Sequence, residues 1–174
     1  SHTLVFFIGT PVAGREHFDL ENQIGFYVNT LALRTQFEGS DSFKTLLGKV
    51  KEVTVGAYQH QSYPFDELVN MLQLPRDMSR NPLFEIQVIL QTTEQVEQTK
   101  KQSLGPLTVS GYDSVKDFTS VFDLVFNFFE NGDELFLKIV YNSDIYKEST
   151  INRILSNVER LLESIVDDPE KPIQ

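Results

Sequence analysis

The sequence predicts a mixed α/β fold in which helices pack on a β-sheet. Some short segments are apolar at every second position or continuously, which is typical of strands, whereas others repeat apolar residues at helical spacing. The 174 residues suit one domain, and 40% of them are apolar, enough to build a core. The predicted order is strand, strand, helix, helix, strand, short strand, hairpin and helix.

The stretch 24–34 is the predicted strand around which the other elements are organised. Its apolar side chains suit a strand buried on at least one face: Phe26, Val28, Leu31 and Leu33. Asn29 and Thr30 interrupt it, and a buried polar group without a hydrogen-bond partner costs about 1–3 kcal/mol. Two interpretations follow. Either Asn29 is satisfied by neighbouring backbone, which residue chemistry favours, or the strand borders a ligand channel.

Two features precede this strand. Residues 3–8 predict a short apolar strand, and a loop over 10–15 leaves it, where Gly14 permits a positive φ. Residues 17–23 are polar and predict a connection.

Two helices follow the organising strand. Apolar residues at three- and four-residue spacing predict an amphipathic helix over 43–58, with Ser40 or Asp41 as its N-cap. A second helix is predicted from Pro64, because proline suits the first helical position. Its short apolar face consists of Phe65, Leu68, Val69 and Leu72.

The second half of the chain predicts strands over 84–90, 107–112, 121–129 and 135–142, and a helix over 149–166. Asn131-Gly132 is a hairpin turn signal. The nearly continuous apolar run of 121–129 indicates a strand covered on both faces, with Asp123 and Asn127 punctuating one of them. The polar excursions 10–23 and 91–106 are long enough to reach a neighbour.

A dense polar loop over 74–84 contains Arg76, Asp77, Arg80 and Asn81. We expect an Arg–Asp network that pins this loop to the body of the domain. An anion site is the alternative, but no Gly-rich phosphate cradle accompanies it.

Composition excludes several classes of function. The net charge of −10 repels phosphate backbones, so nucleic-acid binding is not expected. Without cysteine there is no disulfide framework and no thiol nucleophile, and no apolar run is long enough to span a membrane. His60 lies outside any Ser/His/Asp or metal-ligand pattern. We expect a cytoplasmic location, and a chain cut from something longer because it starts directly on a strand.

Four motifs carry a resemblance to a known family. They are TPVAGR at 10–15, IGFYVNTL at 24–31, HQSYPFD at 60–66 and RDMSRNPLF at 76–84, followed by YNSDIY at 141–146. In order and at about these spacings, they resemble the later core motifs of condensation domains of nonribosomal peptide synthetases. The resemblance spans essentially the whole chain. Each motif alone is weak, but four in order are highly specific.

The resemblance implies a chloramphenicol-acetyltransferase-like fold, whose two lobes form a V. In this family carrier proteins dock on opposite faces and feed phosphopantetheine-tethered acyl groups into a tunnel, where the acceptor amine attacks the donor thioester. The catalytic His-His-x-x-x-Asp-Gly motif lies in the N-terminal lobe, but His2, His17 and His60 are never paired here. We therefore predict that residues 1–168 are the C-terminal lobe, that 169–174 start a linker, and that the chain alone is inactive.

The resemblance also assigns residues and partners. Asn29 and Thr30 are the best tunnel-lining candidates, Gly14 and Arg15 come second, and no catalytic or metal-binding residue is expected. The motif residues with expected structural roles are Arg34, His60, Pro64, Phe65, Arg76, Asp77, Arg80 and Asn81. The expected partners are the missing N-terminal lobe, the donor and acceptor carrier proteins, and an adjacent adenylation domain. No cofactor is expected on the chain itself, only the phosphopantetheine arm as tethered substrate.

Alternatives stay open. A non-catalytic module that docks a carrier protein or an adenylation domain is one, and a heterocyclisation-type relative is another. Epimerisation domains differ in the Val-Asn-Thr and Asn-Pro-Leu-Phe segments, which this chain keeps. Because a missing lobe exposes apolar surface, we hypothesise that the fragment forms a homodimer or is only marginally stable.

Overall fold

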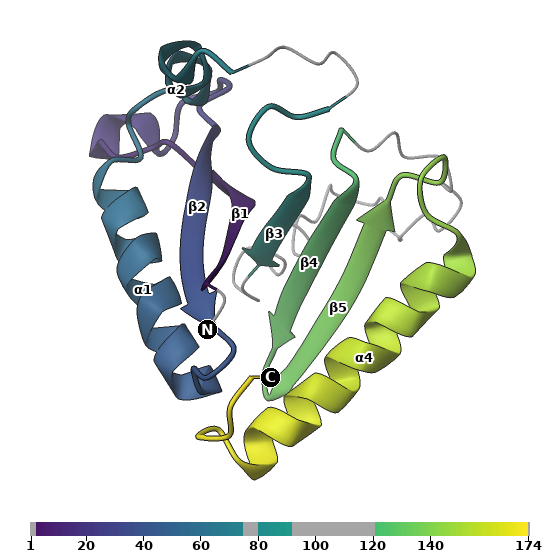
Figure 1. Cartoon of the computed structure of the whole chain (residues 1–174). Helices are drawn as coiled ribbons and strands as arrows, with labels where there is room; N and C mark the ends of the chain where they lie inside the picture. The colour runs from purple at the N-terminus through teal and green to yellow at the C-terminus, as the bar shows by residue number, and fades with distance from the viewer. Residues whose placement is uncertain (1–2, 75–79, 92–120, 174) are drawn as a thin grey trace.

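The computed structural model describes residues 3–74, 80–91 and 121–173. A five-stranded sheet in the order β2-β1-β3-β4-β5 forms its centre, so the predicted mixed α/β fold is confirmed (Figure 1). The strands are β1 Thr3–Val12, β2 Asn29–Glu38, β3 Ile86–Gln91, β4 Leu124–Asn131 and β5 Glu134–Tyr141. The helices are the 3-10 turn η1 Phe18–Leu20, α1 Phe43–Gln59, α2 Phe65–Leu72 and α4 Glu148–Asp167.

The sheet consists of two parts. β1 and β2 pair antiparallel along their whole lengths, from Thr3 opposite Glu38 to Val12 opposite Asn29. β3 and β4 pair in parallel, and β4 and β5 form the predicted antiparallel hairpin, in which Gly132 takes a φ of 64°. Between the two parts, the register of β1 with β3 holds a single pair, Gly9 with Gln87. The strands of the two parts spread apart from this joint (Figure 1).

Phe84 fills the joint between the two parts. Its side chain is 3% exposed, and its ring lies 5.6 Å from the ring of Phe65 and 5.4 Å from that of Phe122. A Cβ atom at Gly9 would lie 2.0 Å from the Phe84 ring, so only glycine admits the ring here. The absence of one side chain on β1 is thus what allows β1 and β3 to meet over a buried aromatic.

The helices lie at both ends of the sheet. α1 contacts β2, and α4 follows β5 in the chain. Figure 1 shows α1 on the β2 side of the molecule and α4 on the β5 side. The apolar stripe of α4 is buried at its N-terminal end, where Ile151 is 4% exposed. The side chains of Leu161 and Val166 near its C-terminal end are exposed.

The predicted starts of α1 and α2 are wrong by one or two residues. Ser42, not Ser40 or Asp41, caps α1 by accepting the Thr45 N–H. The Asp41 carboxylate instead accepts the Glu38 N–H at 2.9 Å and pairs with Lys49 at 2.5 Å, so it closes the turn before the helix. Pro64 is the N-cap of α2 rather than its first helical residue, since its ψ of 136° is extended.

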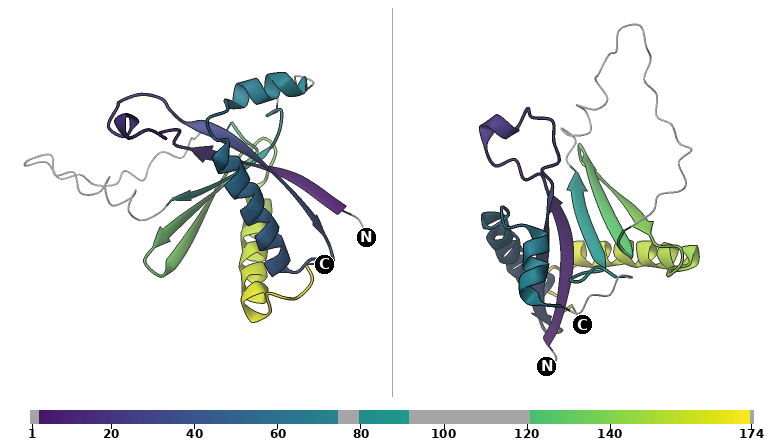
Figure 2. Two further views of the ribbon diagram at one scale, coloured as in Figure 1. Left: turned by 90° about the vertical axis from the view of Figure 1, so that its left-hand side faces the viewer. Right: turned by 90° about the horizontal axis from the view of Figure 1, so that it is seen from above.

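The strand predicted over 24–34 is wrong at its start. β2 begins at Asn29, the side chain of Ile24 is fully exposed, and Phe26 is 89% exposed. Residues 13–28 are instead a loop containing η1, which projects beyond the sheet (Figure 2). The apolar composition of this segment indicates a strand. In the structure, however, the carbonyls of Gln23 and Gly25 accept hydrogen bonds from the Arg15 side chain, which holds the segment as a loop.

The other boundaries follow the predictions with shifts. β1 is longer than predicted and includes Pro11, while β4 starts at Leu124. Leu124 and Val125 are adjacent, point to opposite faces and are both buried, which confirms that both faces are covered there. The short strand predicted over 107–112 and the excursion 91–106 lie outside the described residues, except for Gln91 at the end of β3.

We predict that Gly9→Ala destabilises the chain by about 1–3 kcal/mol, because the new methyl group overpacks against a ring that two other rings hold in place. Gly48→Ala is the matched control. No atom lies within 4 Å of a Cβ there, so this change within α1 should stabilise by about 0.5–1 kcal/mol. Urea unfolding of both variants measures the two free energies, and equal effects would contradict the proposed joint.

Candidate functional site

The Asn29 side chain ties the start of β2 to the connection between α1 and α2. Its Nδ2 donates to the carbonyls of Gln61 at 2.7 Å and Tyr63 at 2.8 Å, and its Oδ1 accepts the Phe65 N–H at 3.2 Å. Phe65 is the first residue of α2, whose N-cap Pro64 has no side-chain hydrogen bond. Asn29 therefore supplies the cap of α2 from a distant strand.

These three bonds match the interpretation in which neighbouring backbone satisfies Asn29. Both polar atoms of its amide are used by protein partners. Thr30 follows it on β2, and successive strand residues point to opposite faces of a sheet, so Thr30 faces away from this connection. That Asn29 and Thr30 line a tunnel stays a prediction.

The strand registers sort the sheet residues into two faces. Ala32 lies opposite Gly9, and Gly9 opposite Gln87, so these three positions share one face. This face is mixed. Its polar side chains are Thr3, Thr30, Arg34, Gln36, Glu38, Gln87, Gln91, Asn127, Asn131, Glu134 and Lys138. Its larger apolar side chains are Val5, Phe7, Ile89, Val125, Phe129, Phe136 and Val140. The other face is mainly apolar, with Phe6, Ile8, Leu31, Leu33, Val88, Phe126, Phe128 and Ile139. Asn29 lies on this apolar face and bonds to the α1–α2 connection, so the helical connection lies on that side of the sheet. The face that contains Gly9, Ala32 and Gln87 is the opposite one. It is here called the polar face, and it is the candidate functional surface.

Arg15 organises the loop 13–28. Its Nη1 donates to the Leu20 carbonyl and, at 2.7 Å, to the Gln23 carbonyl, and its Nη2 donates to the Gly25 carbonyl at 3.3 Å. Its guanidinium carbon lies 4.4 Å from the centre of the Tyr27 ring, a cation–π arrangement. The Arg15 guanidinium thus binds three backbone carbonyls of the loop, and its several N–H donors in a fixed plane are suited to this.

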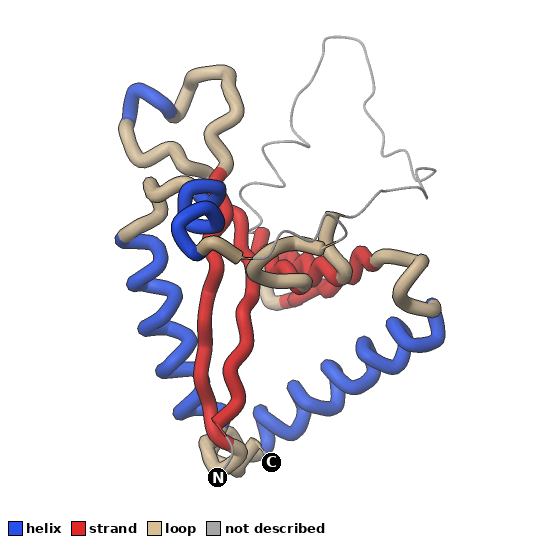
Figure 3. The backbone as a smooth tube through the Cα atoms, turned by 45° about the horizontal axis from the view of Figure 1, so that its top comes forward, coloured by secondary structure: helices blue, strands red, loops and turns tan. Residues whose placement is uncertain are grey.

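Gly14 lets this loop close. Its φ is 63°, a left-handed conformation, and a Cβ atom would lie 1.9 Å from the Tyr27 carbonyl oxygen. The closed loop turns the apolar side chains of Phe18, Ile24 and Phe26 outward into solvent. The loop projects beyond the ends of β1 and β2 (Figure 3).

Arg80 and Asn81 have local roles in the described part of the polar loop. Arg80 pairs with Glu85 at 2.9 Å, and both side chains are largely exposed. Asn81 Oδ1 accepts the Leu83 N–H at 3.2 Å, which forms a turn that delivers Phe84 to the joint. Arg76 and Asp77 lie outside the described residues, so the Arg–Asp network stays a prediction.

His60 and Arg34 are surface residues. His60 ends α1 as its C-cap, through its backbone N–H to the Ala57 carbonyl at 3.1 Å, and its side chain is exposed. Arg34 lines an open cleft of about 480 Å³ between β2 and α1, together with Lys49 and Glu52. Because charges of both signs line this cleft, it selects no ion and we assign it no ligand.

Gln87 is a candidate site residue that sequence reasoning missed. It is nearly buried at the centre of the polar face, next to Gly9. The sequence signal for Gln87 is a polar residue between the apolar residues Ile86 and Val88. The alternation of polar and apolar residues indicates a strand but does not show that Gln87 lies next to Gly9.

Within residues 3–74, 80–91 and 121–173, no three His, Cys, Asp or Glu side chains gather as they would around a metal ion. In the same ranges, no helix is both long and apolar enough to cross a bilayer.

The sequence model of the family described as "Condensation domain" matches residues 2–174. The chain belongs to the condensation domain family. It is 38% identical to tyrocidine synthase 3 of Brevibacillus parabrevis over 166 residues, which are 95% of this chain and 2% of that synthase. It is 37% identical to gramicidin S synthase 2 of Brevibacillus brevis over 162 residues, which are 93% of this chain and 4% of that synthase. The chain thus spans a small part of these relatives.

Solved structures share the fold. A four-domain nonribosomal peptide synthetase solved with AMP and glycine matches with a TM-score of 0.84 at 23% identity, over 97% of this chain and 14% of the other. The condensation domain of the Monacolin K polyketide synthase matches with a TM-score of 0.75 at 18% identity, over 98% of this chain and 38% of the other. The predicted chloramphenicol-acetyltransferase-like class is therefore confirmed.

We predict that Asn29→Asp destabilises the chain more than Asn29→Ala does. Alanine loses the three hydrogen bonds, at about 0.5–1.5 kcal/mol each. Aspartate keeps the acceptor for Phe65 but places a carboxylate oxygen against two carbonyl oxygens, which repel it.

Urea unfolding compares the two variants with Asn152→Ala at an exposed position of α4, which should change stability little. An aspartate variant as stable as the wild type would show that Asn29 does not clamp the α1–α2 connection.

Proposed function

We propose that residues 1–168 are the C-terminal lobe of a condensation domain of a nonribosomal peptide synthetase, with 169–174 as the start of a linker. One observation carries the proposal. The family match runs over residues 2–174, yet the sequence has no paired histidines, so the matched part lacks the His-His-x-x-x-Asp-Gly motif. Coverage of only 38% of a solved condensation domain supports the assignment to one part of a domain.

The proposed reaction joins two carrier-bound substrates. The acceptor amine attacks the donor thioester carbonyl, a C–N bond forms, the C–S bond breaks, and the proton lost from nitrogen goes to the released thiol. Such a step needs both substrates held in position and a group that moves the proton. We assign no described residue of this chain to proton transfer, so the isolated chain is inactive in this proposal.

The polar face is the proposed tunnel wall. It presents hydroxyl and amide groups of Thr30, Gln87 and Asn127 from the three strands β2, β3 and β4. A phosphopantetheine arm carries amide groups and one hydroxyl group along its length, and such groups can form hydrogen bonds with these side chains when they leave water. Thr30 is the member of the Asn29-Thr30 pair whose side chain can reach this wall, while Asn29, Gly14 and Arg15 shape its rim.

The loop 13–28 is the proposed contact with the missing N-terminal lobe. Its fold is held by Arg15 while Ile24 and Phe26 stay in solvent, an arrangement that costs free energy unless a partner covers it. The further proposed partners are the donor and acceptor carrier proteins, the latter on a docking face of this lobe, and an adenylation domain. Membership in this synthetase family supports these partners and a cytoplasmic location.

The assay that tests the proposal is peptide-bond formation between a loaded donor carrier and a loaded acceptor carrier. The chain alone should give no product, whereas adding the upstream lobe of the same gene in trans should give product. The same upstream lobe with both motif histidines replaced by alanine is the matched control and should abolish product.

Each outcome is informative. Product from the chain alone would overturn the assignment, and a residue such as Asn29 or His60 would then carry the chemistry. Carrier binding without product in any combination would favour the docking module.

We predict that the isolated chain self-associates through the loop 13–28. The double variant Ile24→Ser/Phe26→Ser should shift sedimentation velocity profiles toward monomer without lowering the urea midpoint, because both side chains are solvent-exposed. Val166→Ser, an equally exposed apolar site on α4, is the control and should leave the profile unchanged. A monomeric wild-type chain at high concentration would refute this prediction.

A further inference from the structure

The segment after α4 folds back onto the start of α1. The Lys44 N–H donates to the Pro169 carbonyl at 3.1 Å, and the Ile173 N–H donates to the Asp41 carbonyl at 2.9 Å. Between these bonds, Ser42 and Pro172 form an antiparallel β-bridge. These are backbone contacts between segments that are more than a hundred residues apart, so they do not follow from local turn geometry.

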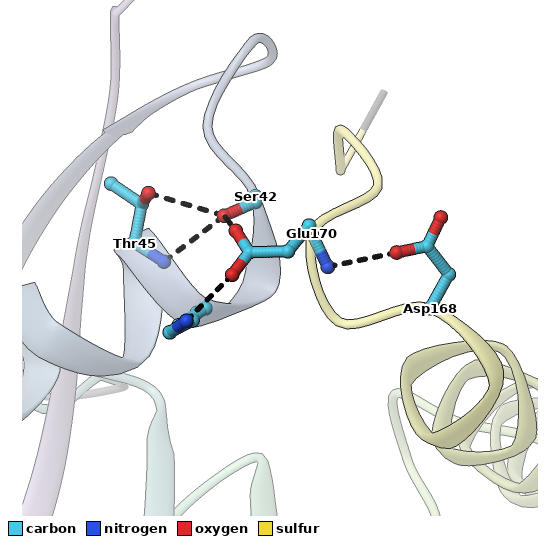
Figure 4. A network of polar contacts seen from close by, with 5 residues as sticks. Ser42, Thr45, Asp168 and Glu170 are labelled. Carbon is cyan, nitrogen blue, oxygen red and sulfur yellow. Dashed lines mark hydrogen bonds and ion pairs between the residues drawn. The ribbon is translucent and has the colours of Figure 1, made fainter.

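Side chains add to this contact (Figure 4). The Glu170 carboxylate accepts from Lys44 Nζ at 2.7 Å and from Ser42 Oγ at 3.4 Å. The Ser42 hydroxyl is also the N-cap of α1, since it accepts the Thr45 N–H at 3.2 Å. The carboxylate thus lies at the positive end of α1, where a negative charge is favourable. On its other side, the Glu170 N–H donates to Asp168 Oδ1 at 3.1 Å, which shapes the turn.

The contact links two parts of the fold whose strands pair at a single position. α1 packs on β2, and α4 follows β5, so the segment connects the helix at one end of the sheet to the helix at the other. Figure 3 shows the β1–β2 pair and α4 diverging from a common corner, where this segment lies. Within the sheet, the two parts pair at Gly9 and Gln87.

We propose that residues 168–173 act as a clasp that sets the angle between the β1–β2–α1 part and the β3–β4–β5–α4 part of the fold. The polar face spans both parts, so the clasp controls its shape at a distance. If 169–174 begin a linker, as proposed above, the linker leaves the body only beyond the clasp. The clasp itself rests on contacts within this chain and does not depend on the proposed reaction.

The backbone contacts of the clasp are expected to contribute more to its stability than its ion pair does. Lys44 and Glu170 are 70% and 61% exposed, and an exposed ion pair contributes little by itself. The backbone bonds and the bridge position the segment, and the ion pair orients it. Removing the charge should therefore loosen the clasp in part, and removing the segment should release it.

Spin-label distances test the proposal in this chain, whose natural sequence has no cysteine to interfere. Labels at Lys51→Cys on α1 and Glu163→Cys on α4 measure the distance between the two parts of the fold. Glu134→Cys with Glu163→Cys reports within one part and is the control. All three positions are exposed.

Ending the chain at Asp168 should broaden the cross-part distance distribution by about twofold or more and leave the control pair unchanged. Glu170→Lys should broaden it less, and the charge swap Lys44→Glu/Glu170→Lys should partly restore it. A cross-part distribution that is the same after truncation would overturn the proposal, and so would equal broadening of the control pair, which would indicate general unfolding.

The pH dependence gives a second readout. The hydrogen bond from Lys44 lowers the pKa of Glu170, and the bond to Glu170 raises the pKa of Lys44. The ion pair therefore stabilises the clasp between these two values, and the contribution is lost as pH falls through the lowered Glu170 pKa or rises through the raised Lys44 pKa. On acidification, the distance distribution between the labels on α1 and α4 should broaden in the wild-type background until it resembles that of Glu170→Gln. The distribution of Glu170→Gln itself should not change as the pH falls. An identical acid response in both chains would mean that another group controls the angle.

Discussion

The fold depends on the meeting of Gly9 and Gln87 across β1 and β3. Each part of the sheet is otherwise built from strands that pair along their lengths, whereas this joint is one residue pair wide. It exists because Gly9 leaves room for the Phe84 ring, which packs against Phe65 of α2 and Phe122 before β4. A buried aromatic, in place of a longer ladder of hydrogen bonds, holds the two parts together.

Two polar residues from the family motifs have structural roles in this chain. Asn29 makes three hydrogen bonds to the backbone of the α1–α2 connection and the start of α2. Arg15 makes three hydrogen bonds to backbone carbonyls of its own loop. Both come from family motifs, and both are tunnel-lining candidates by resemblance. Their observed contacts place α2 and shape the loop 13–28, so both side chains have structural roles.

Local pattern predicts much of the fold. The helices over 43–58 and 149–166 match α1 and α4 closely, and the turn at Asn131-Gly132 lies where its residues indicate. Their signals are periodicity and turn chemistry, which a few neighbouring residues determine. The prediction for 24–28 is wrong because its apolar composition resembles a strand, while the contacts that make it a loop come from Arg15. The N-cap prediction is wrong because three polar residues in a row offer equivalent caps.

The sequence by itself determined the amphipathic elements, the family motifs and the absence of paired histidines, because these are properties of residue order alone. Tertiary structure decided which backbone groups Asn29 binds, which polar side chains share a face with Gln87, and that Glu170 returns to Lys44. Each of these depends on strand register or on segments brought together by the sheet. Such contacts form only when distant parts of the chain pack, so no local window of sequence specifies them.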